Sequence, residues 1–254
     1  MARHYKTQRF EVARLLERAI LEGLIRPGIK LPELLLSREL GVSQASVREA
    51  LQHLESAGLV VKYPNRGSYV IALTAEDLVA IYQLRQELEP MACALAAERM
   101  GPESLDALQA CIQEMQTAAK QHNYRAHSNA DQRFHRLIWE AQPNRYLEKL
   151  LKVICLPLFA NDLVRRNPTA YLNYERSTRQ HTLILRALGT RDPSLVQKLV
   201  RRLIRRFLRQ DLVDFSLLQG ATVQSCDDLE KILASMRSPS AGSPAFPRSS
   251  NPSP

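Results

Sequence analysis

The spacing of apolar residues predicts that the chain begins with two helices separated by a sharp break. Between about 8 and 23, apolar residues recur at the spacing of one helix face. They are Val12, Leu16, Ala19 and Ile20. The segment "RPGIKLP" (26–32) contains two prolines and a glycine, which end this helix. A short helix is predicted over 33–40, and Gly41 suits its carboxyl end because glycine adopts the left-handed conformation at little cost.

A third helix and two short strands follow. The helix is predicted from Ser43, a favourable N-cap residue, to Gly58. Its apolar face consists of Val47, Ala50, Leu51 and Leu54. The runs "LVVKY" and "GSYVIA" have the composition of strands and are joined by the turn-forming sequence "PNRG". Helix, helix, turn, helix and hairpin is the order of a winged helix-turn-helix, which is predicted to occupy residues 1–73.

Long helical patterns dominate the rest of the chain. Thr74 and the two acids of "TAED" are typical of a helix start, and this pattern continues to Gly101. Further helices are predicted at about 102–121, 124–141, 144–160, 170–188, 193–216 and 225–236. The fold class is therefore mainly α, with an all-helical domain over 74–236 behind the winged helix-turn-helix. Residues 237–254 contain five Pro and six Ser and are expected to be disordered, because they cannot bury enough apolar surface to order themselves.

Composition narrows the class of partner. The formal charge of +9 and the isoelectric point near 9.6 favour a polyanion, although these values alone do not separate nucleic acid from an anionic membrane. No apolar run approaches the roughly 18 residues of a membrane span, and no signal peptide is visible. A cytoplasmic protein without membrane contact is therefore expected. The four cysteines form no CxxC pair and are expected to be reduced core residues.

The helix that begins at Ser43 carries polar and small residues beside its apolar face. Such residues in the first turns of a helix suit entry into a DNA major groove, and the cations of the following hairpin suit phosphates or the minor groove. A polar face in contact with solvent is the alternative for the helix taken alone. The predicted DNA contacts are Ser43, Gln44, Ala45, Ser46 and Arg48 in the helix, and Lys62, Asn65, Arg66 and Gly67 in the hairpin.

These residues also resemble a known family. The segment 10–72, with "LGVSQASVREALQHLESAGLV" at its centre, is similar to the amino-terminal domain of the GntR family of bacterial transcription regulators. Members often have Arg-Thr-Pro after the motif serine, whereas this chain has Gln44-Ala45-Ser46. The resemblance therefore implies a DNA reader with an altered operator preference, because an arginine suited to guanine is absent and a glutamine suited to adenine is present. Arg48 of the Val-Arg-Glu-Ala-Leu motif is retained.

The helical part resembles the effector domain called FCD, of the FadR subfamily, over about 75–215. The similar segments are "LRQELEP" (84–90), "DQRFH" (131–135) and "QHTLILRALGTRDP" (180–193). In many members, an Asp and three His hold a divalent metal beside which an organic acid binds. The resemblance implies that Asp131, His135 and His181 are metal ligands, that Zn, Ni or Mn is a candidate cofactor, and that a small organic acid is the effector.

The metal-ligand set departs from the family pattern. Asp131 and His135 are four residues apart and share a helix face, as metal ligands often do. The third family histidine falls 22 residues after His181, at Leu203, which is expected to face the core with Leu199, Val200 and Phe207. His127, one turn before Asp131, is a further candidate ligand. The alternative is that the three histidines are ordinary hydrogen-bonded residues in a cavity.

Two charged features have both a plain and a functional interpretation. Arg85 and Glu89 are spaced for an intrahelical salt bridge, while the resemblance implies that both belong to the effector site, where Arg85 holds an effector carboxylate. The basic segment 198–210 is interpreted as a solvated outer face rather than a second nucleic-acid surface.

The predicted function is that of a ligand-responsive transcriptional regulator that binds a palindromic operator on double-stranded DNA as a homodimer. Repression is the commoner outcome in the family, and activation would use the same physics. Hinge residues are expected at about 71–74. Two alternatives stay open: a constitutive DNA-binding regulator whose helical domain only dimerises, and a metal-dependent enzyme, for which no motif supplies a nucleophile or a base.

Overall fold

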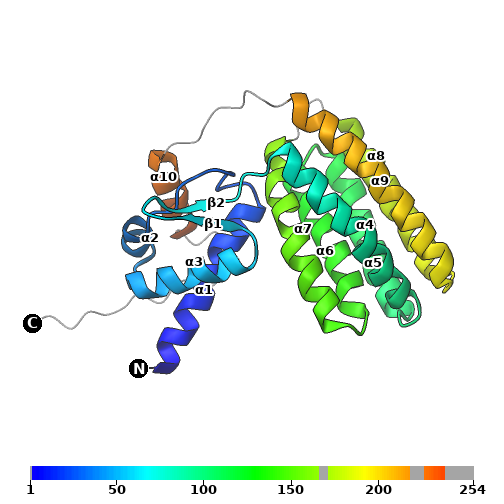
Figure 1. The fold of residues 1–254 in the computed structure, drawn as a ribbon, viewed down its shortest axis with the longest axis horizontal. Helices are drawn as coiled ribbons and strands as arrows, with labels where there is room; N and C mark the ends of the chain where they lie inside the picture. The colour runs from blue at the N-terminus through cyan, green and yellow to red at the C-terminus, as the bar shows by residue number, and fades with distance from the viewer. Residues whose placement is uncertain (1, 166–170, 218–225, 238–254) are drawn as a thin grey trace, which may run out of the picture. The chain divides into compact units, whose positions relative to one another are not determined.

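The computed structural model describes residues 2–165, 171–217 and 226–237, and it divides into two compact units (Figure 1). One unit contains the chain up to Ala72 together with the C-terminal helix α10 (Cys226–Arg237). The other unit extends from Leu73 through helix α9. The fold class predicted from the sequence is confirmed: the described chain is mainly helical, with one two-stranded antiparallel hairpin in its N-terminal part.

The first unit is assembled around three helices. They are α1 (Ala2–Leu21), α2 (Glu33–Leu40) and α3 (Gln44–Ser56). The predicted apolar faces of α1 and α3 are buried, and the two helices pack against each other. Helix α1 begins earlier than its apolar periodicity predicts, because the polar residues before position 8 include no helix breaker and simply continue the helix.

The turn between α2 and α3 has the conformation that its residues predict. Gly41 lies in the left-handed region with φ of 65°, and its N–H donates to the carbonyl of Ser37. Ser43 caps α3, since its side-chain oxygen accepts the N–H of Ser46 at 3.1 Å. The two caps fix where one helix stops and the next begins, and they therefore fix the direction in which α3 leaves the turn.

The hairpin consists of β1 (Val60–Tyr63) and β2 (Gly67–Val70), paired in antiparallel register. Its turn is closed by the N–H of Arg66, which donates to the carbonyl of Tyr63 at 3.1 Å. Asn65 adopts a positive φ of 60°, a conformation that asparagine tolerates better than most residues. The hairpin thus presents its tip residues from a tight turn (Figure 1).

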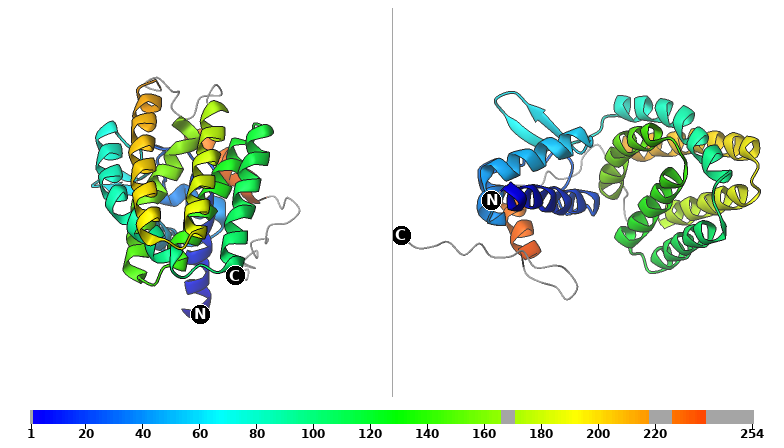
Figure 2. Two further views of the ribbon diagram at one scale, coloured as in Figure 1. Left: turned by 90° about the vertical axis from the view of Figure 1, so that its right-hand side faces the viewer. Right: turned by 90° about the horizontal axis from the view of Figure 1, so that it is seen from below.

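The second unit is a bundle of long helices that lie side by side (Figures 1 and 2). They are α4 (Ala75–Ala97), α5 (Pro102–Lys120), α6 (Tyr124–Ala141), α7 (Arg145–Arg165), α8 (Tyr171–Gly189) and α9 (Pro193–Leu217). Helix α4 packs against α9 and α7, while α5 packs against α6 and α8. Thr74 and Asp77 form the reciprocal cap at the start of α4 that the sequence predicts.

Helix α7 extends past the predicted end at 160, although Pro157 lies inside it. The side-chain amide of Asn161 donates to the carbonyl of Pro157 at 2.8 Å, and its oxygen accepts the N–H of Leu73 at 3.2 Å. This buried side chain therefore ties the first residue of the bundle to α7.

Helix α10 corrects the predicted domain assignment. The sequence places the segment 225–236 in the helical bundle, but in the structure α10 packs against α2 in the first unit. Leu229 and Leu233 are fully buried, and the guanidinium of Arg38 lies 2.9 Å from the carboxylate of Glu230. The sequence pattern predicted this helix, but periodicity carries no information about the surface that covers a helix.

The remaining sequence expectations are met in part. Cys93, Cys111 and Cys155 are buried free thiols, as expected, while the side chain of Cys226 lies outside what the structure describes. In the described part of the chain, no helix has both the length and the apolar character that a membrane span requires. The Ser/Pro-rich segment was predicted to be disordered, and its residues from 238 onward are not among those that the structure describes.

Candidate nucleic-acid interface and metal centre

The amino-terminal half of α3 presents an exposed face. Gln44, Ala45 and Arg48 are exposed, while Val47 and the rest of the apolar face are buried. Ser46 is predicted from the sequence as a DNA contact, but in the structure it is 2% exposed and its hydroxyl lies 3.0 Å from that of Ser43. Ser46 therefore belongs to the helix cap and is not available to a base edge. The face that remains is small and polar, with one cation.

Arg48 is held in place by an acid of the preceding helix. Its guanidinium donates through two nitrogens to one carboxylate oxygen of Glu33, at 3.1 and 2.9 Å. Next to it, Glu49 pairs with Arg9 of α1 at 2.8 Å. Both pairs are substantially exposed, so each contributes little to stability. The pair with Glu33 thus holds the Arg48 side chain on the helix surface.

The tip of the hairpin supplies the other predicted contacts. Lys62, Asn65, Arg66 and Gly67 are all exposed. Among the described residues of this unit, no carboxylate lies within ion-pair distance of Lys62 or Arg66. The structure thus places the predicted hairpin contacts on the surface of the unit that carries α3. Their contact with DNA stays a prediction.

In the bundle, α6 and α8 bring three potential metal ligands together. The Oδ1 atom of Asp131 lies 2.7 Å from Nε2 of His181 and 3.9 Å from Nε2 of His135. The two Nε2 atoms are 3.2 Å apart. Ligands bound to one zinc-sized ion at about 2.0–2.2 Å lie about 3.0–3.5 Å from one another, so these separations bracket those of a three-ligand site. The structure therefore contains a possible Asp/His/His metal site.

The orientation of His181 supports this interpretation. Its Nδ1 lies 2.8 Å from the carbonyl of Ser177. A carbonyl only accepts, so Nδ1 carries a hydrogen, and the Nε2 lone pair of the neutral ring is directed toward Asp131 and His135. Backbone carbonyls commonly orient metal-bound histidines in this way.

Asp131 provides the test of fit. Its Oδ1 atom is buried, and in the described structure no donor meets it with hydrogen-bond geometry, in spite of its closeness to His181. A buried carboxylate oxygen without a donor is unfavourable unless a cation balances it. The residues present therefore fit a divalent metal held by one carboxylate oxygen and two imidazole nitrogens, with the remaining positions open to other ligands.

The electrostatics of the cluster distinguish its two histidines. Burial lowers the pKa of His135 to about 4, against the opposing effect of Asp131, so this ring is neutral near pH 7. Burial also disfavours the charged form of His181, but Asp131 outweighs burial and raises its pKa. Burial alone would raise the pKa of Asp131, yet His181 and His135 hold it well below its usual range. Asp131 thus favours the charged form of His181 and would also favour a cation at this position.

His127 is engaged by another side chain, and Leu203 is a core residue. The Nε2 atom of His127 is 3.1 Å from the hydroxyl of Thr178, and that hydroxyl donates to the carbonyl of Tyr174. Thr178 therefore accepts from His127, whose Nε2 carries a hydrogen and is not free to bind a metal. Leu203 is 4% exposed, which confirms that it faces the core.

The predicted effector residues adjoin the histidines. Arg85 and Glu89 are both buried, and the guanidinium of Arg85 donates to the carboxylate of Glu89 one turn later along α4. The other oxygen of Glu89 lies 3.9 Å from Nδ1 of His135, and the thiol of Cys155 approaches Glu89 at 3.6 Å. Burial would raise the pKa of Glu89, but Arg85 lowers it, so the carboxylate is charged. Arg85, Glu89 and the candidate metal ligands thus form one buried polar cluster.

Sequence reasoning missed the residues that support this cluster. Ser177 acts through its backbone carbonyl, which any residue would supply, so no sequence signal marks it. The approach of Glu89 to His135 depends on how α4 meets α6, and residue spacing within one helix does not report that packing. Thr178 had a weak signal, since it is a polar residue on the buried face of an amphipathic helix.

Comparison with protein families assigns both parts of the chain. Residues 8–70 match the family of bacterial regulatory proteins named gntR, and residues 80–206 match the FCD domain. The chain is 31% identical to the uncharacterized HTH-type transcriptional regulator YdhC of Bacillus subtilis over 172 residues. This match covers 66% of this chain and 72% of YdhC. It is 28% identical to the gluconate operon transcriptional repressor of Bacillus licheniformis, over 74% of this chain and 78% of the repressor.

Solved structures share the fold of this chain. The crystal structure of a putative transcriptional regulator GntR from Rhodococcus sp. RHA1 gives a TM-score of 0.69 at 23% identity, over 82% of this chain and 98% of that one. The structure of Escherichia coli McbR/YncC gives a TM-score of 0.65 at 26% identity, over 80% and 97% of the two chains. The matched domains and relatives are transcriptional regulators and not enzymes, so the metal-dependent enzyme is not supported.

Proposed function

The chain belongs to the GntR family of bacterial regulatory proteins and carries an FCD domain, and on this premise we propose that it is a ligand-responsive repressor. It binds a palindromic operator as a homodimer and responds to a small organic acid. The observation that carries the proposal is the exposed first half of α3, capped by Ser43 and followed by an exposed basic hairpin in the same unit.

The DNA-reading face supports a preference for particular bases. Gln44 can bond adenine through two hydrogen bonds, and Ala45 is small enough to allow the backbone close to the groove or to contact a thymine methyl group. Arg48 suits guanine or a phosphate once it leaves Glu33. Lys62 and Arg66 serve as phosphate or minor-groove contacts, which position the unit on the duplex.

A homodimer is proposed because one recognition helix contacts only a short DNA sequence. A single recognition helix contacts only a few base pairs, and a two-fold dimer places two such helices about one helical turn apart on the duplex. An operator with two inverted half-sites matches that symmetry. Repression is proposed because a relative over most of the chain is named as an operon repressor.

The charge of the buried cluster supports an anionic effector. A divalent metal held by Asp131, His135 and His181 would join Arg85 as a second cationic centre, and together they would exceed the charges of Asp131 and Glu89 by one positive charge. A small carboxylate would compensate this excess, because an arginine guanidinium can bind a carboxylate with two parallel hydrogen bonds. Zn, Ni and Mn are all compatible with a carboxylate and two imidazoles.

The effector acts only if it prefers one arrangement of the DNA-reading units over another. The expected hinge at about 71–74 includes Leu73, whose N–H is bonded to Asn161 of α7. A change in the packing of α7 would therefore move Leu73, the first residue of the bundle, through this hydrogen bond.

A constitutive regulator is the second candidate, because Leu203 replaces one family ligand. Fluorescence anisotropy separates the two. A labelled fragment from upstream of the protein's own gene is titrated with protein, and a panel of small mono- and dicarboxylates is added with and without zinc, nickel or manganese. Release by one carboxylate supports the proposed sensor. Tight binding that no carboxylate changes, together with no thermal stabilisation by any of them, supports the constitutive regulator.

A further inference from the structure

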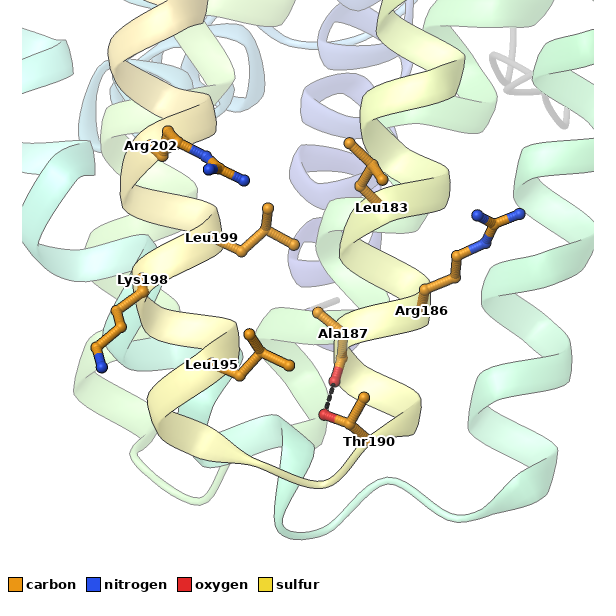
Figure 3. Close-up of a pocket in the computed structure, with 8 residues that line it drawn as sticks. All are labelled: Leu183, Arg186, Ala187, Thr190, Leu195, Lys198, Leu199 and Arg202. Carbon is orange, nitrogen blue, oxygen red and sulfur yellow. Dashed lines mark hydrogen bonds between the residues drawn. The ribbon is translucent and has the colours of Figure 1, made fainter.

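Helices α8 and α9 form a helical hairpin with an open apolar groove along its outer side. The groove holds about 510 Å³. Its floor is made by residues one turn apart on each helix: Leu183 and Ala187 of α8 face Leu195 and Leu199 of α9 (Figure 3). Thr190, near the connection, donates its hydroxyl to the carbonyl of Ala187 and closes one end. We call this surface the α8–α9 groove.

Cations line both edges of the α8–α9 groove. Lys198 and Arg202 lie on the α9 side and Arg186 lies on the α8 side, with the Arg202 guanidinium extending across the gap (Figure 3). In the described chain, none of the three has a carboxylate within ion-pair distance. No acidic residue lines the groove.

The other cations of α9 are placed differently. Arg201 pairs with Glu87 of α4 at 2.9 Å, and Arg205 donates to the side chain of Gln86 at 3.2 Å. The basic face of α9 was interpreted from the sequence as solvated throughout. The structure divides it into a side that bonds to α4 and a side that borders the groove without acidic partners.

The apolar floor is exposed enough to require a reason. The side chains of Leu183 and Leu195 are 42% and 46% exposed, and they lie in one groove rather than scattered over the surface. Clustered exposed apolar residues with a polar rim mark interaction surfaces more often than scattered ones do. The openness of these leucines also disfavours a small ligand, because a small-molecule site buries most of its ligand.

Two occupants are disfavoured by charge and by surface chemistry. A second copy related by a two-fold axis through the groove would bring Arg186, Lys198 and Arg202 against their own counterparts, and like charges repel. DNA would satisfy the three cations, but it offers nothing to the leucines of the floor, since phosphates and sugars are polar.

We propose that the α8–α9 groove binds an acidic amphipathic helix of a partner protein. Leucine-like side chains at i, i+3 or i+4 and i+7 of that helix would lie on the floor between α8 and α9. Its Asp and Glu residues would lie at both edges, opposite Arg186 on one side and Lys198 and Arg202 on the other. This function is separate from the buried polar cluster of the bundle and from the DNA-reading face.

The proposal is tested with a synthetic probe and the full chain. The probe is a fluorescein-labelled helical peptide of about 18 residues with leucines at the stated spacing and glutamates on both flanks. A matched peptide carries lysines in place of the glutamates. Anisotropy titrations use the wild type, Arg202→Glu, Leu195→Glu and the control Arg209→Glu, which reverses an exposed α9 charge outside the groove. Thermal unfolding confirms that each variant is folded.

The expected result is saturable binding of the acidic peptide that weakens about tenfold or more in Arg202→Glu and in Leu195→Glu, and little in Arg209→Glu. The lysine peptide binds more weakly than the acidic peptide, and the affinity of the acidic peptide falls between about 50 and 300 mM salt. Equal affinity for the two peptides, or equal affinity of wild type and Arg202→Glu for the acidic one, overturns the proposal.

Two further readouts address the other occupants. If Leu195→Glu lowers the molecular mass in solution from dimer to monomer, the groove is an interface between copies and the proposal is wrong. If Arg202→Glu weakens binding to a DNA fragment about tenfold while peptide binding is unchanged, the groove contacts DNA and the proposal is again wrong. The proposal requires that both mass and DNA affinity stay at their wild-type values.

Discussion

At the scale of single residues, α3 contains both residues that stabilise the helix start and residues that are exposed to solvent. Ser43 and Ser46 are joined at the helix start, and Ser46 is buried there. Gln44, Ala45 and Arg48 remain exposed on the same helix. The exposed side chains are therefore the ones whose substitution should change DNA binding without removing part of the core.

Replacing Arg48 with alanine is expected to weaken operator binding by about 1–3 kcal/mol, because one charged contact to a base or phosphate is lost. Stability should change little, since the Arg48–Glu33 pair is exposed. The measurement is anisotropy with an operator fragment at fixed salt. The matched control is Arg99→Ala, an exposed arginine of the bundle. Equal affinities for wild type and Arg48→Ala would remove this residue from the interface.

The candidate metal site predicts a difference between two buried histidines. Zinc, nickel or manganese should raise the melting temperature of the wild type, because a ligand that binds only the folded protein stabilises it. His135→Ala should lose this rise, since His135 supplies one of the three converging atoms. His127→Ala should keep it, because the Nε2 of His127 donates to Thr178. Loss of the metal response in both variants, or in neither, would contradict the assignment.

Leu203 offers a gain-of-ligand test. Leu203→His should raise metal affinity about tenfold or more over the wild type, because a fourth protein ligand replaces a buried leucine. Competition with a fluorescent chelator measures the affinity. An affinity equal to that of the wild type in a folded variant would show that position 203 does not face the Asp/His/His cluster.

At the scale of elements, periodicity predicted the helices well and their partners poorly. The helix over 33–40 and the helix over 124–141 agree with the structure at both ends, because caps and breakers flank them. Helix α10 was predicted as a helix but assigned to the wrong unit. The reason is physical: a stripe of leucines specifies a buried face, whereas the surface that covers it depends on contacts distant in sequence.

The same distinction holds within the candidate sites. The i, i+4 spacing placed Asp131 beside His135, and the structure brings His181 to them. Nothing in the spacing indicated that Ser46 is buried or that Glu89 approaches His135. The roles of all these residues in binding stay predictions.

The packing of α10 predicts a dependence of the DNA-binding unit on the C-terminal helix. Leu233→Ala should destabilise the first unit by about 2–5 kcal/mol, because a fully buried leucine is removed from its contact with α2. Removal of residues 238–254 should leave unfolding and operator binding unchanged and serves as the control. Hydrogen exchange in α2 measures the effect. Unchanged exchange in α2 of Leu233→Ala, or a large loss of stability on removing 238–254, would contradict this prediction.

At the scale of the whole molecule, the GntR-type unit and the FCD bundle carry separate groups of residues, and their roles in binding DNA, metal and effector are proposals. The GntR-type unit carries exposed polar and basic residues on α3 and the hairpin, and the bundle holds the buried Asp/His/His cluster together with Arg85 and Glu89. The net charge of +9 also favours the approach to a polyanion over long range. DNA reading is the premise on which the effector and the dimer depend, so it is the property to measure first.

Selection from random double-stranded oligonucleotides tests that premise most directly. The purified protein is incubated with the pool at physiological salt, and bound duplexes are recovered and sequenced over several rounds. The account predicts an enriched inverted repeat whose half-sites are centred about one helical turn, or a whole multiple of it, apart. Recovery of duplexes with no shared sequence would contradict it.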